Sequence, residues 1–202
     1  MHQSLVAAVV NERRRISQDL HDGVGSQLVS VLAVLRGLDQ RDDQIIWMVE
    51  RSLIELKTTV DALDGDDDNL IEALGSLRHR FHHLFEAMEI SFAWNVRECQ
   101  KLAGVKGENV LHILKVAQES LTNILSHSNA TSIGLTCAVD DQRNSLVLEV
   151  RDDGTGFRLA ERENDFGKGM RGMQRRAQAL RAALTVRTKV GMGTTVRLEM
   201  PL

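Results

Sequence analysis

The sequence predicts an α+β protein in which a helical hairpin is followed by a domain of mixed helices and strands. Two observations predict this fold class. Apolar residues recur at helical spacing through the first 63 residues, and beyond an acidic segment helical stretches alternate with short strand-like ones. The only proline is Pro201, so no proline breaks a helix before it. We expect the hairpin to span residues 1–64, a linker residues 65–69, and the second domain residues 70–202.

The first domain is predicted to consist of two long helices. Two apolar stripes are separated by a polar break at residues 39–43. Each stripe is too wide for a lone hairpin to cover, so we expect two copies to pair through residues 1–63 as a homodimeric four-helix bundle. The stripes consist of Leu5, Val9, Ile16, Leu20, Val24, Leu28, Val31, Leu35 and Leu38, and then of Ile46, Val49, Leu53, Leu56, Val60 and Leu63.

The acidic segment 64–69 (DGDDDN) ends the hairpin. Its alternating aspartates suggest a calcium loop, but the sixth position is Asn69 instead of the turn glycine. The twelfth position is Gly75 instead of a bidentate glutamate. We therefore interpret the segment as a solvated linker.

The second domain is predicted to contain an antiparallel sheet with helices on one face. Asn69 is a suitable N-cap for its first helix. Two-residue alternation and glycine-rich turns mark the strands. Helices are expected over about 70–88, 108–127 and 170–180, and strands over 90–96, 132–139, 145–151, 184–189 and 194–200.

The composition excludes several classes of protein. Net charge is −3, which gives no electrostatic reason to expect direct nucleic-acid binding. No stretch approaches the roughly 18 apolar residues of a membrane span, and the apolar run near the start lacks a preceding basic region. We expect a cytoplasmic chain, or the cytoplasmic part of a membrane-anchored protein. Cys99 and Cys137 form no paired motif and are expected to be buried free thiols.

Four polar residues at intervals of four form a stripe along the helix predicted over 108–127. They are Lys115, Glu119, Asn123 and His127. An acid, an amide and an imidazole on one face suit a hydrated Mg²⁺ ion and phosphates. On this segment alone, an exposed helix face is the simpler interpretation.

Two glycine-rich turns lie in the second half of the chain, each next to a predicted strand. A strand delivers Asp152 into a turn that contains Gly154 and Gly156, where a carboxylate can accept a hydrogen bond from an exocyclic amino group such as that of adenine. In isolation, a hairpin turn explains this motif equally well. A second turn, Gly191-x-Gly193-Thr194, precedes the last strand.

The segment Gly167-x-Gly169-x-x-Gly172 matches the dinucleotide-binding fingerprint by letter. It follows the polar segment 163–166 instead of a buried strand, and no βαβ unit surrounds it. A better interpretation is a flexible lid that leads into a helix N-terminus, where backbone N–H groups favour phosphate.

Together these motifs resemble the GHKL ATPase superfamily, which includes gyrase-type ATPases, Hsp90 and histidine kinases. The resemblance covers roughly residues 69–202 and implies the α/β sandwich of the Bergerat fold, with ATP and Mg²⁺ bound. It implies that Asn123 and Glu119 hold Mg²⁺ and that Asp152 reads the adenine amino group. The nucleotide-binding residues expected from it are Glu119, Asn123, His127, Asp152, Gly154, Gly156, Gly167, Lys168, Gly169, Met170 and Thr194.

The first helix narrows the resemblance further. Residues 11–63, with the Asp19-Leu-His21-Asp22-Gly23 motif, resemble the phosphoacceptor hairpin of NarX/DesK-like sensor histidine kinases. The sequence Gly-Met173-x-x-Arg176 is also typical of that subfamily. The resemblance implies autophosphorylation of His21 from ATP, with Asp22 orienting the imidazole. The phosphoryl group would then pass to the receiver domain of a LuxR/NarL-type response regulator. His21 is rotated about 100° from Leu20 of the apolar stripe, toward solvent.

Two positions depart from the subfamily. Ser26 occupies the position where Gln or His supports dephosphorylation of the partner, and Gln27 is rotated away, so phosphatase activity is doubtful. Ser126 occupies a position that is often basic, and Lys168 is expected to compensate from the lid.

Other functions fit the sequence less well. A GHKL module that phosphorylates serine or acts as an anti-sigma factor leaves the His21-Asp22 pair unexplained. A non-catalytic scaffold leaves the nucleotide motifs unexplained. His79, His82 and His83 have the spacing of a zinc site, but no carboxylate or thiolate partner is evident.

Overall fold

The computed structural model describes residues 69–97, 99–158 and 168–202, together with Val24, Val31, Ile45, Val49, Ser52 and Leu56. The chain divides into two compact units, residues 1–67 and 68–202. In the first unit, Val24 and Val31 of the first predicted stripe are 43% and 47% exposed in the single chain. The four-helix dimer stays a prediction. No helix within the described ranges is long and apolar enough to cross a membrane.

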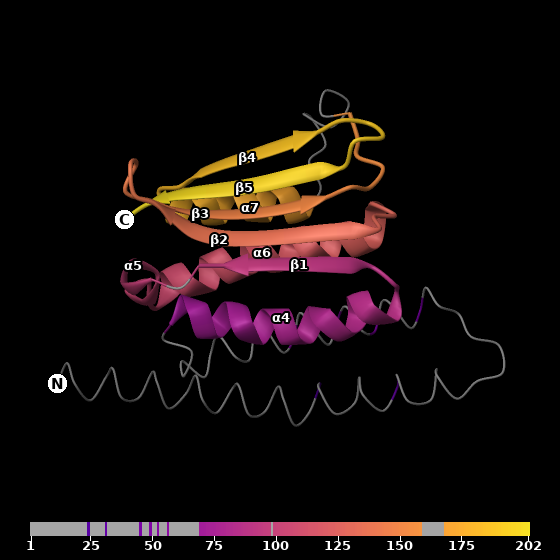
Figure 1. Ribbon diagram of the computed structural model, residues 1–202, viewed down its shortest axis with the longest axis horizontal. Helices are drawn as coiled ribbons and strands as arrows, with labels where there is room; N and C mark the ends of the chain where they lie inside the picture. The colour runs from indigo at the N-terminus through magenta and orange to yellow at the C-terminus, as the bar shows by residue number, and fades with distance from the viewer. Residues whose placement is uncertain are drawn as a thin grey trace. The chain divides into compact units, whose positions relative to one another are not determined.

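The second unit contains every helix and strand that the sequence predicts for it, to within two residues at each end. The short helix α5, which precedes α6, was not expected from the sequence. In chain order and with the labels of Figure 1, the elements are α4 (Leu70–Ala87), β1 (Ser91–Val96), α5 (Gln100–Ala103), α6 (Glu108–His127), β2 (Ser132–Asp140), β3 (Ser145–Asp152), α7 (Lys168–Ala179), β4 (Ala183–Thr188) and β5 (Thr194–Pro201).

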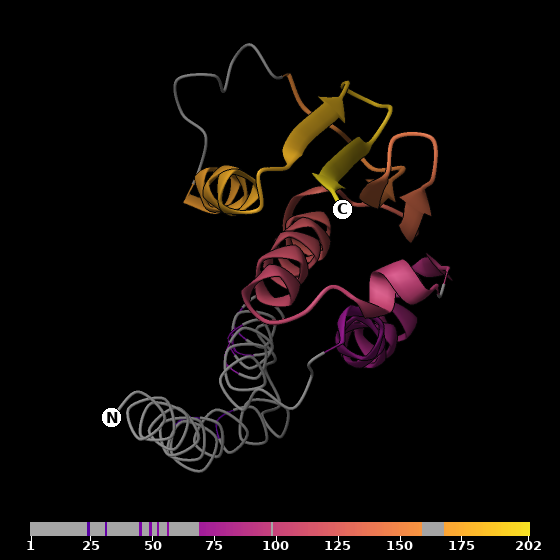
Figure 2. The same ribbon diagram turned by 90° about the vertical axis from the view of Figure 1, so that its left-hand side faces the viewer.

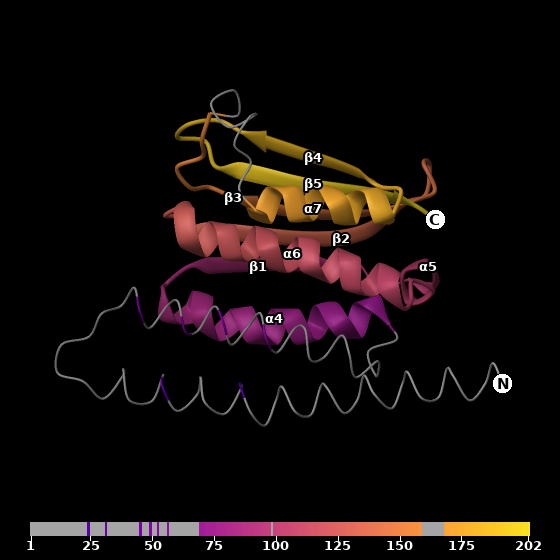
Figure 3. The same cartoon turned by 180° about the vertical axis from the view of Figure 1, so that it is seen from behind.

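The five strands form one sheet in the order β1-β2-β3-β5-β4 (Figure 1). β1 pairs with β2 in parallel, and the other three pairings are antiparallel. Helices α4, α6 and α7 cover one face of this sheet, as Figures 2 and 3 show. The predicted α+β class and the one-sided layering are therefore confirmed, with one parallel pair added at the β1 edge.

The core lies between the sheet and these helices. Residues of β2 and β5 alternate between buried and more exposed, so each strand turns one row of aliphatic side chains inward. Four aromatic residues, Phe81, Phe85, Phe92 and Trp94, gather at the α4–β1 edge, where the Phe85 and Phe92 rings lie 4.8 Å apart between centroids. The largest fully buried side chains are Phe81, Phe85, Leu70, Leu74, Leu77, Leu102, Ile113, Leu121, Ile133, Leu135, Leu146 and Leu148.

The two cysteines differ in exposure. Cys137 is buried in β2, and burial raises the pKa of its thiol to about 12. Cys99, just before α5, is exposed. The expectation that both thiols are buried is therefore wrong for Cys99, because it lies in the connection between β1 and α5 instead of within a core-facing element.

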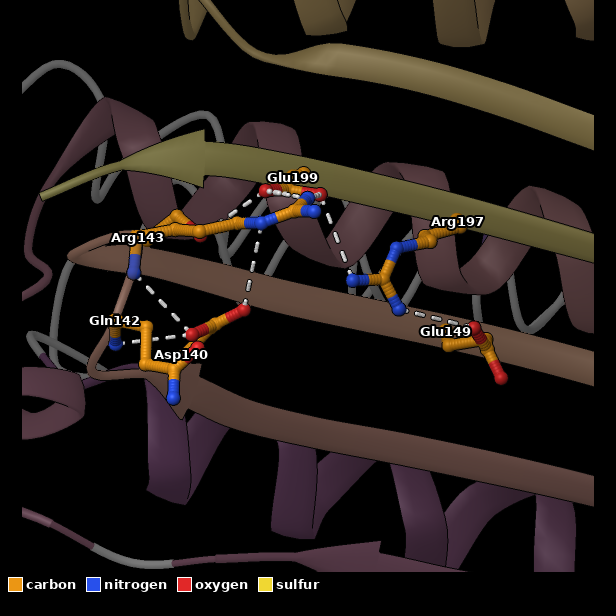
Figure 4. Close-up of polar contacts among 7 residues, drawn as sticks. Asp140, Gln142, Arg143, Glu149, Arg197 and Glu199 are labelled. Carbon is orange, nitrogen blue, oxygen red and sulfur yellow. Dashed lines mark hydrogen bonds and ion pairs between the residues drawn. The ribbon is translucent and has the colours of Figure 1, made fainter.

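The opposite face of the sheet is charged and solvated (Figure 4). Arg197 Nη1 lies 3.2 Å from Glu149 Oε2, and its Nη2 lies 3.5 Å from Glu199 Oε2. Arg143 pairs with Glu199 at 3.2 Å and with Asp140 at 3.9 Å. Exposed pairs of this kind are screened by solvent and contribute little to stability. This face is therefore adapted to water, whereas Asp152 and the stripe of α6 lie on the helix-covered side.

Candidate functional site

The polar stripe predicted along residues 115–127 lies entirely on α6. Glu119 and Asn123 are half-buried, and His127 is exposed at the end of the helix. Within the described residues, no hydrogen bond or ion pair engages the Glu119 carboxylate or the Asn123 amide. Both side chains therefore have oxygens available for a ligand.

The packing of α6 explains why this stripe remains accessible. Ten residues of the helix are buried, so its apolar side is fixed against the sheet and the neighbouring helices. Ser120 and Thr122 donate to carbonyls one turn earlier within α6, at 2.8 Å each, which satisfies their buried hydroxyls. Ser126 does the same at 2.7 Å. The Ser126 hydroxyl therefore bonds to the helix backbone, and position 126 has no positively charged side chain.

Asp152 is the last residue of β3 and is buried, with 3% of its surface exposed. Its Oδ1 accepts a hydrogen bond from the Gly154 N–H at 2.8 Å, and the Thr194 N–H also donates to the carboxylate. Burial raises the pKa of Asp152 above its ordinary value, and the two backbone hydrogen bonds oppose that rise. The structure thus brings two predicted site residues, Asp152 and Thr194, together.

The turn after β3 packs against the C-terminal end of α6. A Cβ atom at Gly154 would collide with the carbonyl of Ser128, the C-cap of α6. The Thr155 N–H donates to that same carbonyl at 2.7 Å. A side chain at position 154 would therefore separate the Asp152 turn from α6.

The turn between β4 and β5 closes over the other side of Asp152. Gly156 has φ +57° and lies against the carbonyls of Lys189 and Gly193. Gly193 has φ +73°, and a Cβ atom there would collide with the Asp152 carbonyl. Both positions combine a left-handed backbone with a close approach, which only glycine tolerates without strain.

Two further residues, Thr188 and Asp153, hold these turns together and were not predicted from the sequence. Thr188 Oγ1 accepts from the Phe157 N–H at 3.0 Å and donates to the Gly193 carbonyl at 3.2 Å. Asp153 accepts hydrogen bonds from the Thr131 and Ser132 N–H groups, both at 2.9 Å, and from the Thr131 hydroxyl at 2.8 Å. No local motif marks Thr131 or Thr188, because their partners Asp153 and Phe157 lie 22 and 31 residues away along the chain.

Helix α7 begins beside the stripe of α6. Gly169 lies so close to the Glu119 side chain that a Cβ atom there would collide with its carboxylate. Ser120 Oγ approaches the sulfur of the buried Met173 at 3.6 Å, so the two helices pack together. Met170 is half-buried and Lys168 is the first residue of α7. The structure therefore brings the predicted lid glycine Gly169 to the predicted stripe residue Glu119.

Several predicted residues lie outside the described residues. They are His21, Asp22, Ser26, Gln27 and Gly167, and the acidic segment before Asn69 lies outside as well. Among the residues that are described, no group of three or more His, Cys, Asp or Glu side chains is placed to hold a metal ion.

The available atoms fit a magnesium nucleotide. An ionised carboxylate has about four acceptor positions, and two N–H groups occupy part of those of Asp152, which leaves room for an amino group. Glu119 and Asn123 offer oxygen atoms, and Mg²⁺ usually takes only one or two protein ligands with water and phosphates.

Comparisons with known proteins give two family matches. Residues 108–202 match the family described as histidine kinase-, DNA gyrase B- and HSP90-like ATPase. Residues 12–84 match a family described as histidine kinase.

A curated relative aligns over the whole chain. The oxygen sensor histidine kinase NreB of Staphylococcus carnosus (strain TM300) is 27% identical over 212 residues, an alignment that covers 100% of this chain. The chain spans 60% of the length of that relative.

Two solved structures share the fold. The histidine kinase domain from the blue-light activated histidine kinase EL346 of Erythrobacter litoralis superposes with a TM-score of 0.63 at 22% identity, covering 96% of this chain and 94% of that one. A structure described as that kinase itself gives a TM-score of 0.60 at 22% identity, covering 93% of this chain and 59% of that one.

Proposed function

The chain belongs to the NarX/DesK-like sensor histidine kinases and comprises their catalytic core, and on that premise we propose that it phosphorylates His21 from ATP and passes the phosphoryl group to an aspartate of a response regulator. The observation that carries the proposal is the environment of Asp152. Its carboxylate is buried and has a raised pKa, and backbone N–H donors fill only part of its acceptor positions. A buried carboxylate with spare acceptor positions at a glycine-lined turn is suited to recognising adenine.

Each end of the nucleotide has proposed partners in the second unit. Asp152 accepts a hydrogen bond from the adenine amino group, while Thr194 holds the carboxylate in place and His127 borders the adenine end from α6. At the phosphate end, Gly167, Lys168, Gly169 and Met170 form the lid and the start of α7, where backbone N–H groups and the helix dipole favour negative charge. Gly154 and Gly156 let the two turns close around the adenine end.

We propose that Glu119 and Asn123 hold Mg²⁺ through their side-chain oxygens. Both are half-buried on α6, without other partners among the described residues, one turn apart. When bound, the ion neutralises negative charge on the phosphates during transfer.

The phosphoryl transfer itself is assigned to the hairpin. A nitrogen of His21 forms a bond to the γ-phosphorus as the bond to the β,γ-bridging oxygen breaks, and ADP leaves. Asp22 accepts the proton from, or orients, the imidazole so that a nitrogen lone pair faces the phosphate. The phosphoryl group then passes from His21 to an aspartate in the receiver domain of a LuxR/NarL-type regulator.

The proposed assembly is a homodimer through residues 1–63, located in the cytoplasm. Light scattering on the purified chain tests the dimer, and polar substitutions at Leu28 or Leu35 are expected to dissociate it, because each places an unpaired polar group in the four-helix core.

Acid-labile phosphate on the chain after incubation with Mg²⁺ and γ-labelled ATP tests the proposed function. We expect label that is lost in acid and resists alkali, as phosphohistidine does. The matched variant is His21→Gln, which should abolish the label and leave ATP affinity unchanged. Acid-stable label would instead indicate a serine kinase, and label that persists in His21→Gln would assign the acceptor to another residue.

We further propose that Ser26 leaves phosphatase activity weak. Dephosphorylation of a regulator needs a side chain that positions water for attack, and the serine hydroxyl is about two bonds shorter than a glutamine amide. Ser26→Gln should speed the decay of purified phospho-regulator and keep autophosphorylation intact. Rapid decay with the unmodified chain would contradict the assignment and direct attention to Gln27.

A further inference from the structure

Gly172 lies in the interior of α7, where glycine is less favourable than alanine because it leaves the backbone freer in the unfolded chain. Its φ is not in the left-handed region, so backbone conformation does not require glycine there. A Cβ atom at this position would lie 2.8 Å from Nη1 and 4.0 Å from Cζ of Arg176. The glycine therefore leaves space for the Arg176 guanidinium.

That guanidinium lies on the side of α7 that faces α6. Gly169, Gly172 and Arg176 are spaced i, i+3 and i+7, so they share one side of the helix. Gly169 on this side lies against Glu119, and the adjacent Met173 lies against Ser120. Helical side chains lean toward the helix N-terminus, and the contact with Gly172 shows that Arg176 does so here.

Arg176 differs from the arginines of the outer sheet face. Arg143 and Arg197 each pair with carboxylates, whereas no hydrogen bond or ion pair joins the half-buried Arg176 guanidinium to another described residue. A guanidinium presents five N–H donors in a planar fork that matches phosphate oxygens. An unpaired fork held in place on the side of α7 that faces α6 is suited to a phosphate group.

The positions of the Asp152 turn and of Glu119 along α6 indicate which phosphate of a nucleotide would lie near Arg176. The Asp152 turn packs against Ser128, while Glu119 lies nine residues earlier beside the start of α7. At 1.5 Å per residue, this separation is roughly 13 Å, about the length of an extended nucleoside triphosphate. Figure 3 shows α6 and α7 side by side, with α7 running back along α6 away from its C-terminal end. A nucleotide anchored by its base at Asp152 would therefore place its terminal phosphate near Glu119 and the start of α7. Gly172, which the Arg176 guanidinium contacts, lies three residues, or roughly 4.5 Å, along α7 from Gly169.

We propose that Arg176 contacts the terminal phosphate of the bound nucleoside triphosphate, and that Gly172 is glycine so that the guanidinium can reach it. This inference rests on the proposed function, because it takes the nucleotide site as given. It assigns this chain a residue that distinguishes ATP from ADP.

Calorimetric titration of the full chain with ATP and, separately, with ADP in the presence of Mg²⁺ tests the proposal. Arg176→Met should weaken ATP binding about tenfold, because a charge-assisted contact with a phosphate is lost. ADP binding should change less than about twofold, since the contact involves the absent phosphate. Arg175→Met, one residue away and exposed, is the matched control and should leave both affinities within about twofold.

Gly172→Ala provides a second variant that keeps the arginine. Its Cβ displaces only the far end of a flexible side chain, so the fold should persist with an unchanged or higher melting temperature. We expect it to weaken ATP binding more than ADP binding. Adding Gly172→Ala to Arg176→Met should cause no further loss, because the two changes remove the same contact.

Equal losses for ATP and ADP in Arg176→Met would overturn the inference, as would unchanged ATP affinity or an equal effect of Arg175→Met. An unmodified chain that binds neither nucleotide would contradict the proposed function and this inference with it. An unmodified chain that prefers ATP, with that preference intact in Arg176→Met, would contradict this inference alone.

Discussion

The buried carboxylate of Asp152 and the exposed carboxylates of Asp153 and Glu199 differ in their hydrogen bonds and in the direction of their pKa shifts. On the helix-covered face, Asp152 is buried, accepts only two backbone hydrogen bonds, and has a pKa raised by burial. At exposed positions, hydrogen bonds from Ser132 and Thr131 lower the pKa of Asp153 in the turn after β3, and a hydrogen bond from Arg143 lowers that of Glu199 on the outer face. The exposed carboxylates are satisfied by the protein itself, and the buried one is not.

This difference separates residues that hold the fold from residues that are available to a ligand. A buried carboxylate with too few donors destabilises the folded chain in its ionised form. A saturated, exposed carboxylate stabilises its turn but has nothing left to offer a ligand. Adjacent positions in one sequence, Asp152 and Asp153, therefore have opposite roles.

The largest effect is expected for Asp152→Asn. The amide presents an NH₂ group where the adenine amino group also donates, which should reduce ATP affinity at least about tenfold. Removing a buried charge should leave the free energy of unfolding at pH 7 equal or higher. Calorimetry and denaturant unfolding measure the two quantities. Unchanged ATP affinity would refute the adenine assignment, and Asp153→Asn is the matched control for binding.

ATP binding should also depend on pH in a way that reports Asp152. Its pKa is raised, so the carboxylate becomes protonated as pH falls through a value above the ordinary one of 3.8. The protonated acid loses acceptor capacity, and ATP affinity should fall with it. Titrations between pH 4 and 7 check this, with Asp152→Asn expected to remove the dependence. A dependence that survives in the variant would assign it to another group.

Gly193→Ala should lower both the stability of the fold and the affinity for ATP. Its Cβ would collide with the Asp152 carbonyl, and its φ is +73°. We expect a loss of about 1–3 kcal/mol in the free energy of unfolding, together with weaker ATP binding. Gly191→Ala is the control, with a similar φ of +76° but open space around its Cβ. Equal effects of the two substitutions would mean that the left-handed backbone alone, and not the contact with Asp152, is responsible.

Asp153→Ala should lower stability and spare ATP affinity once folding is complete. It removes three hydrogen bonds that join the β3 turn to the start of β2, in an exposed setting that reduces their value to roughly 1–2 kcal/mol in total. Because the folded pKa is lowered, this stability is present above the ordinary pKa and lost as pH falls below about 4. An acid denaturation curve that is the same with and without Asp153 would contradict this account.

The smallest effect is expected for Glu199→Gln on the outer face. Its pKa is lowered by Arg143 and Arg197, so any contribution exists above the ordinary carboxyl pKa and disappears as pH falls. The pairs are solvent-exposed and screened, so thermal unfolding in physiological salt should barely change and ATP affinity should not. A marked loss of ATP affinity would show that the two faces are coupled.

The sequence was sufficient for much of the fold. Two-residue alternation located β2 and β3, and the stripe of α6 followed from four-residue spacing, because both signals depend only on neighbouring residues. Helix α5 was not predicted because four residues are too few for periodicity to appear. The parallel β1–β2 pairing was also not predicted, since pairing depends on contacts between distant segments.

What the sequence determined by itself was the family resemblance and the identity of the chemical groups: an acid before a glycine turn, an acid and an amide on one helix face, and glycines before α7. What only the tertiary structure decided was which of these groups meet and which have spare capacity. It brought Thr194 to Asp152, Gly169 to Glu119, and Arg176 over Gly172. It also gave Asp153 a structural role beside its neighbour. The physical reason is that burial and hydrogen-bond saturation depend on residues distant in the chain, which local spacing does not record.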